Sequence, residues 1–229
     1  MSRNWNSNIK TLSDEDFIKQ LHIVAKMFNK YINTKMLFIA NDGRDNPLVY
    51  YEVAIKAERF MHLTGCTTKI VEPRLLYAKG FFKKCLDKTI KREDFDFLHN
   101  KNIATGKLMA LQQSLQYEYA KLFEIGDKTT STQNNEFHFA VGNSNAIVAY
   151  TYVDNSGQAI PTSAMSEPLD KYVAKSFKMV CILIKSINDK LYCNIHSSIT
   201  NKLKEILNRS DIACPELLSK LDMNELFKK

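Results

Sequence analysis

The first clear hydrophobic pattern in the chain is helical and lies near the N-terminus. Apolar residues recur every three or four positions from Phe17 to Ile32, directly after Ser13 and three acidic residues. A serine followed by acidic residues is typical of a helix start, because the hydroxyl caps backbone N–H groups and the acids complement the helix dipole. The pattern predicts an amphipathic helix that ends near Asn33.

Two strand-like stretches follow this helix. Residues 36–40 form a short apolar run, and residues 48–57 are rich in β-branched and aromatic side chains, with the turn signal Asn-Asp-Gly between them. These features predict a hairpin over 36–57. The segment 59–65 comes at the end of the apolar run, so we expect His62 and Thr64 to lie where a sheet element meets a loop. Alternate residues of an extended segment point to the same face, which would place these two side chains together.

The rest of the chain alternates between helical and strand-like patterns. Helices are predicted from Pro73 to Leu86, over about 105–124, over 199–207 and from Pro215, and strands over 137–141, 146–153, 180–184 and 191–195. The sum predicts an α+β fold with N-terminal helices packed on a twisted, mainly antiparallel β-sheet and further helices at the C-terminus. We expect an N-terminal helical segment (1–34), a central α+β domain (35–196) and C-terminal helices (197–229) packed on that domain.

Composition is typical of a globular protein, with 45% hydrophobic and 25% charged residues. No apolar run approaches the roughly 18 residues that cross a bilayer, and the N-terminus lacks the apolar segment of a signal peptide. The five cysteines are odd in number, widely spaced and without a CxxC pair, which argues against a disulfide framework or a zinc site. We therefore expect a cytoplasmic protein that does not bind membranes.

The charge of the chain favours a polyanionic partner. The formal net charge is +7 and the sequence pI about 9.0, which favours nucleic acid ahead of a membrane surface, although proteins of lysine-rich proteomes carry similar charge. The densest basic patch follows Pro73, on the helix predicted there. It is open to two interpretations, a solvated helix face or a surface that tracks phosphates.

Few residues have the pattern of a catalytic site. The segment 105–108 lacks the glycine and the hydroxyl of a phosphate-binding loop, and neither GxGxxG nor HExxH occurs. No carboxylate pair flanks a histidine as a metal site would need, so we expect no metal and no cofactor. His62 titrates near neutral pH and suits proton transfer, but a histidine beside Met61 and Leu63 also fits a buried core position. The other four histidines, among them His99 in a predicted loop, are expected to be structural or exposed.

Residues 60–65, Phe-Met-His-Leu-Thr-Gly, resemble the F-x-HLTG signature of a family found on phages and mobile elements. That family is the phage-borne fourth group of the Barnase–EndoU–colicin–RelE-like nuclease superfamily. Residues 81–85 with 94–95, 106–108, 140–143 with 149–150, and 160–163 resemble later family segments in the same order, so that the resemblance spans roughly 36–195. The chain departs from the family at Ala149-Tyr150, where Gly-Phe is usual, and at Cys66, where Val or Leu is usual. The fold that the resemblance implies, helices on a twisted, mainly antiparallel sheet, agrees with the hydrophobic pattern.

Carried over by position, the resemblance implies a site made of His62, Thr64, Lys107 and either Thr162 or Ser163. We expect His62 to act as a general base or acid, and Lys107 with Arg59 to stabilise the phosphate in the transition state. The residues expected to contact RNA are Lys69, Arg74, Lys83, Lys84, Asn143, Thr162 and Ser163.

The predicted function is that of a metal-independent RNA endonuclease, a toxin or defence factor of a mobile element. In RNA cleavage the substrate's 2′-OH is the nucleophile and the product is a cyclic phosphate, so the enzyme need only supply a base, an acid and positive charge. RNA is the expected partner, and a cognate inhibitor protein is a candidate second one. The alternative is a non-catalytic RNA- or protein-binding module on the same scaffold, in which His62 and Thr64 make a structural hydrogen bond. A third hypothesis is binding of acidic proteins through the basic helix.

Overall fold

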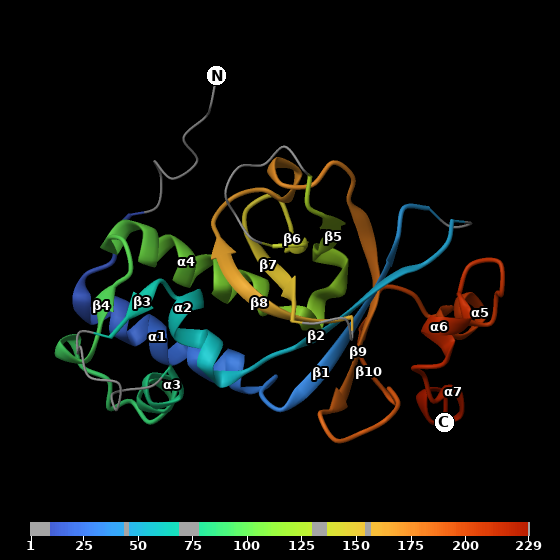
Figure 1. The fold of residues 1–229 in the computed structure, drawn as a ribbon, viewed down its shortest axis with the longest axis horizontal. Helices are drawn as coiled ribbons and strands as arrows, with labels where there is room; N and C mark the ends of the chain where they lie inside the picture. Colours follow the sequence, from blue (N-terminus) through green and yellow to red (C-terminus); the bar gives the residue numbers. More distant parts are fainter. Residues whose placement is uncertain (1–9, 44–45, 69–77, 130–136, 154–156, 229) are drawn as a thin grey trace.

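A computed structural model of the chain describes residues 10–43, 46–68, 78–129, 137–153 and 157–228 (Figure 1). Within these ranges seven strands close into a β-barrel in the order β1-β2-β8-β7-β6-β5-β9, because β9 pairs with β1 as well as with β5. An eighth strand, β10 (Asn194–Ser198), pairs with β9. The barrel strands are β1 (Thr34–Asn41), β2 (Val49–Ala54), β5 (Glu124–Asp127), β6 (Phe139–Gly142), β7 (Ile147–Tyr152), β8 (Gln158–Met165) and β9 (Phe177–Ser186).

The prediction of helices packed on a twisted open sheet is wrong, because the sheet closes on itself. The hairpin between β1 and β2 is present as expected, with Lys35 opposite Ala54. Closure comes from three pairings between strands that are far apart in the sequence. Strand β9 runs antiparallel to both β1 and β5, and β2 runs parallel to β8. Local hydrophobic patterns carry no information about such pairings, which explains the error.

Strand β1 is buried on both faces. Met36, Phe38 and Ala40 belong to the core cluster that includes the barrel interior and the N-terminal helices, whereas Leu37 and Ile39 belong to a second cluster with the C-terminal helices. Successive side chains of a strand point to opposite faces. A strand with apolar contacts on both sides therefore needs the uninterrupted apolar run that the sequence has here.

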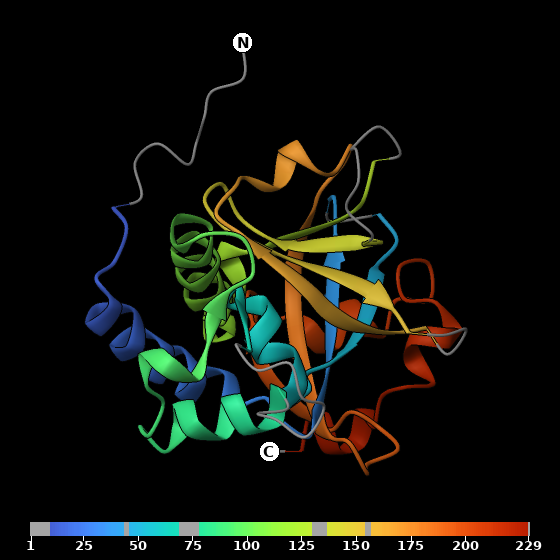
Figure 2. The same cartoon turned by 60° about the vertical axis from the view of Figure 1, so that its left-hand side comes forward.

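Helices cover two opposite sides of the barrel (Figures 1 and 2). On one side lie α1 (Asp14–Asn29), α2 (Phe60–Leu63), α3 (Ala78–Leu86) and α4 (Lys101–Ser114), and on the other α5 (Leu203–Leu207), α6 (Pro215–Leu218) and α7 (Met223–Leu226). No helix in the described ranges combines the length and the apolar character needed to span a membrane. The domain boundaries given above stay predictions.

Helix α1 confirms the first sequence prediction. Its N-cap is Ser13, whose hydroxyl accepts a hydrogen bond from the Asp16 backbone N–H at 3.0 Å. Its apolar face, which includes Phe17 and Leu21, is fully buried.

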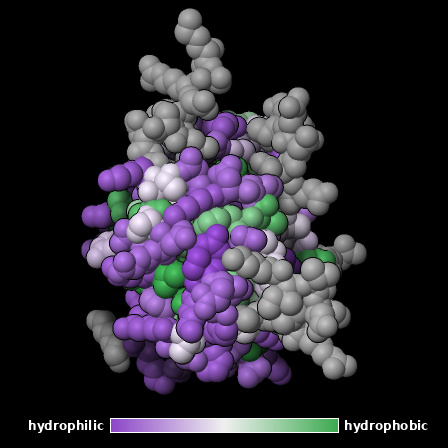
Figure 3. Space-filling view, turned by 90° about the vertical axis from the view of Figure 1, so that its left-hand side faces the viewer, coloured by the Kyte–Doolittle hydropathy of each residue, from purple (hydrophilic) through white to green (hydrophobic). Residues whose placement is uncertain are grey.

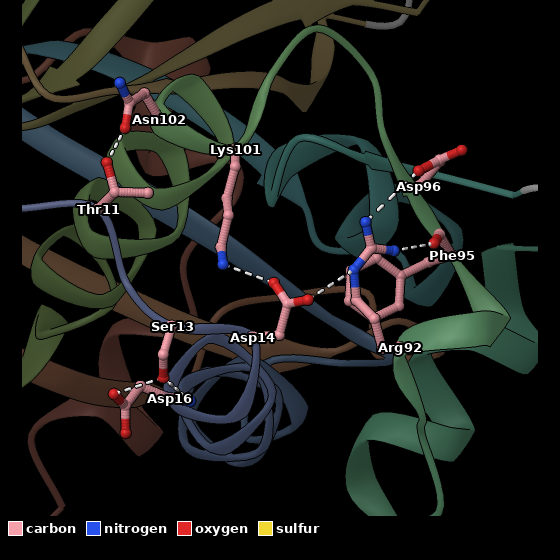
Figure 4. A network of polar contacts seen from close by, with 9 residues as sticks. All are labelled: Thr11, Ser13, Asp14, Asp16, Arg92, Phe95, Asp96, Lys101 and Asn102. Atoms are coloured by element: carbon pink, nitrogen blue, oxygen red, sulfur yellow. Dashed lines mark hydrogen bonds and ion pairs between the residues drawn. The ribbon is translucent and has the colours of Figure 1, made fainter.

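Ion pairs tie the start of α1 to the segment around β4 (Asp96–Phe97), as Figure 4 shows. The Asp14 carboxylate accepts from Lys101 Nζ at 2.5 Å and from Arg92 Nε at 3.3 Å. The Arg92 guanidinium also donates to the backbone oxygen of Phe95 and lies over the rings of Phe95 and Phe97, at 5.1 and 4.8 Å from their centroids. Arg92 therefore serves the packing of α1 against β4.

Several element boundaries differ from the sequence prediction. Helix α4 begins earlier than expected, with Asn100 as N-cap, and ends at Ser114, before the 3-10 helix η4 (Tyr117–Leu122). Strand β2 stops at Ala54, and a 3-10 helix, η2 (Ala57–Arg59), leads directly into α2. The predicted start of α3 at Pro73 lies outside the described residues. The segment 160–163 forms the middle of β8.

Candidate functional site

The segment that contains His62 is helical, which corrects the prediction of a strand end. Phe60 of α2 is fully buried, and its ring lies 5.3 Å from that of Phe28 and 5.1 Å from that of Phe82. His62, two positions later, is exposed. Aromatic packing of Phe60 therefore holds α2 against α1 and α3 and leaves the imidazole at the surface.

Thr64 follows α2 as its C-cap and is fully buried. Its hydroxyl donates to the Met61 backbone oxygen at 2.8 Å. Residues two positions apart in a helical turn differ by about 200° in direction, so His62 and Thr64 point to opposite sides. The expectation that they share one face is wrong, because it assumed an extended backbone.

Gly65 allows the turn after α2 to contact α4 closely. Its φ is +73°, in the left-handed region that glycine adopts without strain. A Cβ atom at this position would lie 2.9 Å from Ala104 Cα and 3.1 Å from Lys107 Cδ. The glycine of the signature thus permits the approach that brings Lys107 beside the His62 turn.

Lys107 and Ser163 are brought together by the packing of α4 on β8. The Lys107 ammonium donates to Ser163 Oγ at 2.9 Å, and Ser166 Oγ donates to the backbone oxygen of Gly106 one residue away from Lys107. Burial lowers the pKa of Lys107. The neighbouring Thr162 instead donates to the Ala149 backbone oxygen at 3.2 Å. Of the two hydroxyls considered from sequence, Ser163 is the one that contacts Lys107.

The environment of His62 favours its neutral form. The pKa of His62 is lowered, first by desolvation and then by the positive charges of Lys107, Arg59 and His99. Arg59 lies in η2, and its Nε atom is buried without a hydrogen-bond partner among the described residues. The three charged side chains that lower the pKa of His62 all carry positive charge when protonated. A site of this kind attracts an anion and offers an imidazole that accepts a proton near neutral pH.

Among the other predicted RNA contacts, the described residues have partners of their own. Lys83 and Lys84 of α3 are each paired, with Asp87 and Asp94 respectively, both at 2.6 Å. The side chain of Asn143 accepts from the backbone N–H groups of residues 145 and 146 at the turn between β6 and β7. Lys69 and Arg74 lie outside the described residues.

Sequence reasoning missed His99, which the structure brings into the electrostatic environment of His62. Its position follows from the pairing of β3 (Cys66–Thr67) with β4 and from the hydrogen bond of the Leu98 N–H to the Gly65 oxygen at 2.8 Å. Two-residue strands leave no periodic pattern in a sequence, so no local signal pointed to this contact.

No group of three His, Cys, Asp or Glu side chains within the described ranges is close enough to hold a metal ion. Metal independence itself stays a prediction.

The view in Figure 3 is from the side of the molecule on which α1 and α4 lie, and this face is largely hydrophilic with small apolar patches.

Comparison with known proteins yields a family for the chain. No curated protein and no solved structure matches it. One family model, described as phage-Barnase-EndoU-ColicinE5/D-RelE like nuclease4, matches residues 20–201. This range includes every strand of the barrel and all of the cluster around His62, and it confirms the resemblance seen over residues 36–195. The chain therefore belongs to the phage-Barnase-EndoU-ColicinE5/D-RelE like nuclease4 family.

Proposed function

We propose that this protein is an endoribonuclease that needs no metal ion and cleaves RNA by attack of the substrate's 2′-OH on the adjacent phosphate. Its membership of a nuclease family supports cleavage of a nucleic acid. The observation that carries the rest is the approach of Lys107 to the turn after His62, where the charges of Lys107 and Arg59 lower the pKa of the imidazole. Cleavage through the 2′-OH uses this set of groups, since the nucleophile belongs to the substrate.

In this mechanism His62 removes the proton of the 2′-OH, and the 2′-oxygen then attacks phosphorus. Lys107 and Arg59 stabilise the negative charge that accumulates on the phosphoryl oxygens. The hydrogen bond to Ser163 holds the Lys107 ammonium in place, at 2.9 Å. Partial burial of Lys107 supports this role, because a charge in a desolvated site interacts more strongly with phosphate than one in water. Thr64 acts indirectly, by closing the turn that carries His62.

Expression in cells tests the proposal. We expect wild-type protein to generate specific new RNA ends and His62→Ala protein to generate none. Because His62 is exposed, its replacement should leave the melting temperature nearly unchanged. His138→Ala is the matched control, since His138 is also an exposed histidine but lies just before β6. Intact RNA in cells that express the wild-type protein would contradict the proposal.

Metal independence needs a separate test with purified protein. The rate of cleavage should be the same with and without EDTA, because the proposed groups all belong to the chain. Loss of activity in EDTA and recovery with a divalent cation would show that the metal-independent mechanism is wrong while leaving nuclease activity intact.

One observation favours the second candidate, a non-catalytic binding module. The Thr64 hydroxyl serves the backbone of its own turn, as a purely structural signature residue would. Under this alternative the cationic cluster holds RNA that remains uncut, and His62→Ala protein binds RNA as tightly as wild type. A filter-binding titration beside the cleavage assay separates the two functions.

A further inference from the structure

We propose that the cavity between α4 and the turn from β6 to β7 binds one nucleobase of the RNA, close to the phosphate that is cleaved. This inference rests on the proposed endoribonuclease function and deepens it, because it assigns a site that recognises the sequence of the substrate.

The cavity lies along one face of α4 and has a volume of about 390 Å³. Thr105, Met109 and Gln113 recur at intervals of four residues, so they form one wall of it. Leu12, from the segment before α1, and Pro168, from the segment after β8, line it from other sides. Cavities of this size hold small organic ligands, a class to which a nucleobase with its ribose belongs.

The segments that enclose the α4 cavity are fixed to α4 by hydrogen bonds of their own. The Thr11 hydroxyl donates to Asn102 Oδ1, which holds the segment before α1 against the helix (Figure 4). After β8, Ser166 lines the cavity, and its hydroxyl donates to the Gly106 backbone oxygen at 2.6 Å. Walls that are held in this way form a site before any ligand arrives.

The wall opposite α4 is the turn from β6 to β7. Asn143 Oδ1 accepts from the Asn145 backbone N–H at 2.8 Å, which fixes the conformation of the turn. The Leu169 N–H donates to the Asn143 backbone oxygen at 3.0 Å and joins the turn to the segment that contains Pro168. Asn143, expected from sequence to contact RNA, thus positions the turn that lines the cavity.

Thr105 provides a polar group that the fold leaves unused. Its side chain is fully buried, and its hydroxyl has no hydrogen-bond partner among the described residues. A threonine hydroxyl in a helix commonly donates to a carbonyl oxygen one turn earlier, but Thr105 makes no such bond. Buried polar groups normally have a partner, and a polar atom of a ligand in the cavity would provide one.

The lining matches the chemistry of a nucleobase. It combines apolar side chains with the Thr105 hydroxyl and with the side-chain amides of Gln113 and Asn145. A base has apolar faces, and its edges carry both hydrogen-bond donors and acceptors. Hydroxyl and amide groups provide both complements without a net charge.

The charged residues of the lining also suit RNA. Lys10 is exposed and provides a positive charge for the backbone phosphate. The carboxylate of Glu167 already accepts from Lys171 Nζ at 2.7 Å and from the Tyr172 hydroxyl. Its negative charge is therefore compensated within the protein.

A single turn of α4 connects the cavity to the candidate active site. Thr105 lines the cavity, and Lys107, two residues later, donates to Ser163 Oγ at 2.9 Å. Ser163 and Ser166 are three residues apart, a distance of roughly 10 Å along an extended chain. A phosphate at Lys107 and a base in the α4 cavity therefore fit one short stretch of a single RNA strand.

The base preference of cleavage tests this inference. Purified protein is incubated with oligoribonucleotides that span a cleavage site mapped in cells and carry each of the four bases at the positions beside it. We expect wild-type protein to prefer one base at one of these positions. Thr105→Val keeps the side-chain volume but removes the hydroxyl, and should reduce this preference about 2–10-fold, the effect of one uncharged hydrogen bond. Thr105→Ser keeps the hydroxyl and should retain the preference.

A second pair of variants tests the cavity by size. Ser144, in the turn, lines the cavity and is exposed, so Ser144→Leu should fold normally, narrow the cavity and weaken the base preference. Ser219→Leu makes the same change at an exposed serine after α6 and should have no effect. Cleavage by wild-type protein without any base preference, or an unchanged preference in both Thr105→Val and Ser144→Leu, would overturn the inference while the proposed function stands.

An NMR titration with free nucleotides tests the site without any cleavage. The four nucleoside 3′-monophosphates are added separately, and at least one should shift the amide signals of residues 105–113 and 144–145 to saturation. The same nucleotide should bind Ser144→Leu more weakly than it binds wild type or Ser219→Leu. If none of the four shifts these signals, the inference is wrong even where RNA is cleaved. Nucleotide binding at these residues by a wild-type protein that cuts no RNA would contradict the proposed function and assign the base site to the non-catalytic binding module.

Discussion

At the scale of single residues, the proposed function depends on how the protein sets the pKa of His62. Desolvation and the neighbouring positive charges place this pKa below its ordinary value of 6.5. The unfolded chain therefore takes up a proton at higher pH than the folded chain does. The contribution of His62 to stability is present above pH 6.5 and falls as the pH drops from 6.5 toward the folded pKa.

The first prediction concerns this titration. The His62 ring should titrate below 6.5 in the folded protein, and Lys107→Met should raise its midpoint by removing the positive charge that lowers the pKa most. The control is Lys228→Met, near the C-terminus, where the lysine pairs with Glu225. NMR of the imidazole protons measures the midpoint of the His62 titration in the wild-type protein and in the two variants. A His62 midpoint at or above 6.5 in the wild-type protein would contradict this description of the site.

The sequence predicted which residues belong to the candidate site better than it predicted how their side chains are placed. The family resemblance pointed to His62, Thr64, Lys107 and either Thr162 or Ser163, and in the structure Lys107 contacts Ser163. The direction of His62 was not predictable, because α2 has four residues, little more than one turn, and leaves no helical period. His99 was missed because its position depends on the tertiary pairing of β3 with β4.

At the scale of elements, the contact of the His62 turn with α4 depends on Gly65. Gly65→Ala introduces a Cβ about as close as 2.9 Å to the α4 backbone, and the residue keeps a φ of +73°. We expect a loss of about 2–5 kcal/mol in the free energy of unfolding, which combines left-handed strain with overpacking. Gly157→Ala is the matched control, with the same φ and open space around the Cβ, and should cost about 1–2 kcal/mol.

Chemical denaturation of the two alanine variants measures this difference. Equal losses would contradict the close packing of the turn on α4. Gly65→Ala should also lower nuclease activity in conditions where the variant is fully folded, because α4 carries Lys107.

The Arg92 network makes a second prediction at this scale. Arg92→Ala removes an ion pair to Asp14, a hydrogen bond to the Phe95 oxygen and contact with two aromatic rings. Such partly exposed interactions are worth about 0.5–1.5 kcal/mol each, so we expect a loss of about 1–3 kcal/mol in the free energy of unfolding. Lys19→Ala, which breaks an exposed pair with Glu15, should leave the free energy of unfolding nearly unchanged. Similar losses in the free energy of unfolding for the two variants would show that the Arg92 network does not hold α1 against β4.

At the scale of the whole molecule, the closed barrel is the feature that the sequence did not reveal. The strands themselves were largely predictable, since β1, β2 and β7 have strong β signals. Closure depends on which strands meet. Strand β1 pairs with β9, β5 with β9 and β2 with β8, and the partners of each pair lie far apart in the chain. The continuous apolar run of β1 indicates that the strand is buried on both faces. It does not indicate which helices cover each face.

Barrel closure predicts a pattern of amide hydrogen exchange. Strand β1 is paired on both sides and buried on both faces, so its amides should exchange only through global unfolding. Strand β10 pairs with β9 and is largely exposed, and its amides should exchange faster. Fast exchange throughout β1 would argue against a closed barrel.

One measurement tests the central claim, that the cluster around His62 cleaves RNA through the substrate's own 2′-OH. Purified protein in EDTA is incubated with two oligonucleotides of one sequence, of which the second carries a single 2′-deoxy nucleotide at the cleavage site. We predict that the all-ribose strand is cut to a 2′,3′-cyclic phosphate and a 5′-OH, identified by mass, and that the substituted strand stays intact. Cleavage of the substituted strand at the same site, or products with a 5′-phosphate, would contradict the account.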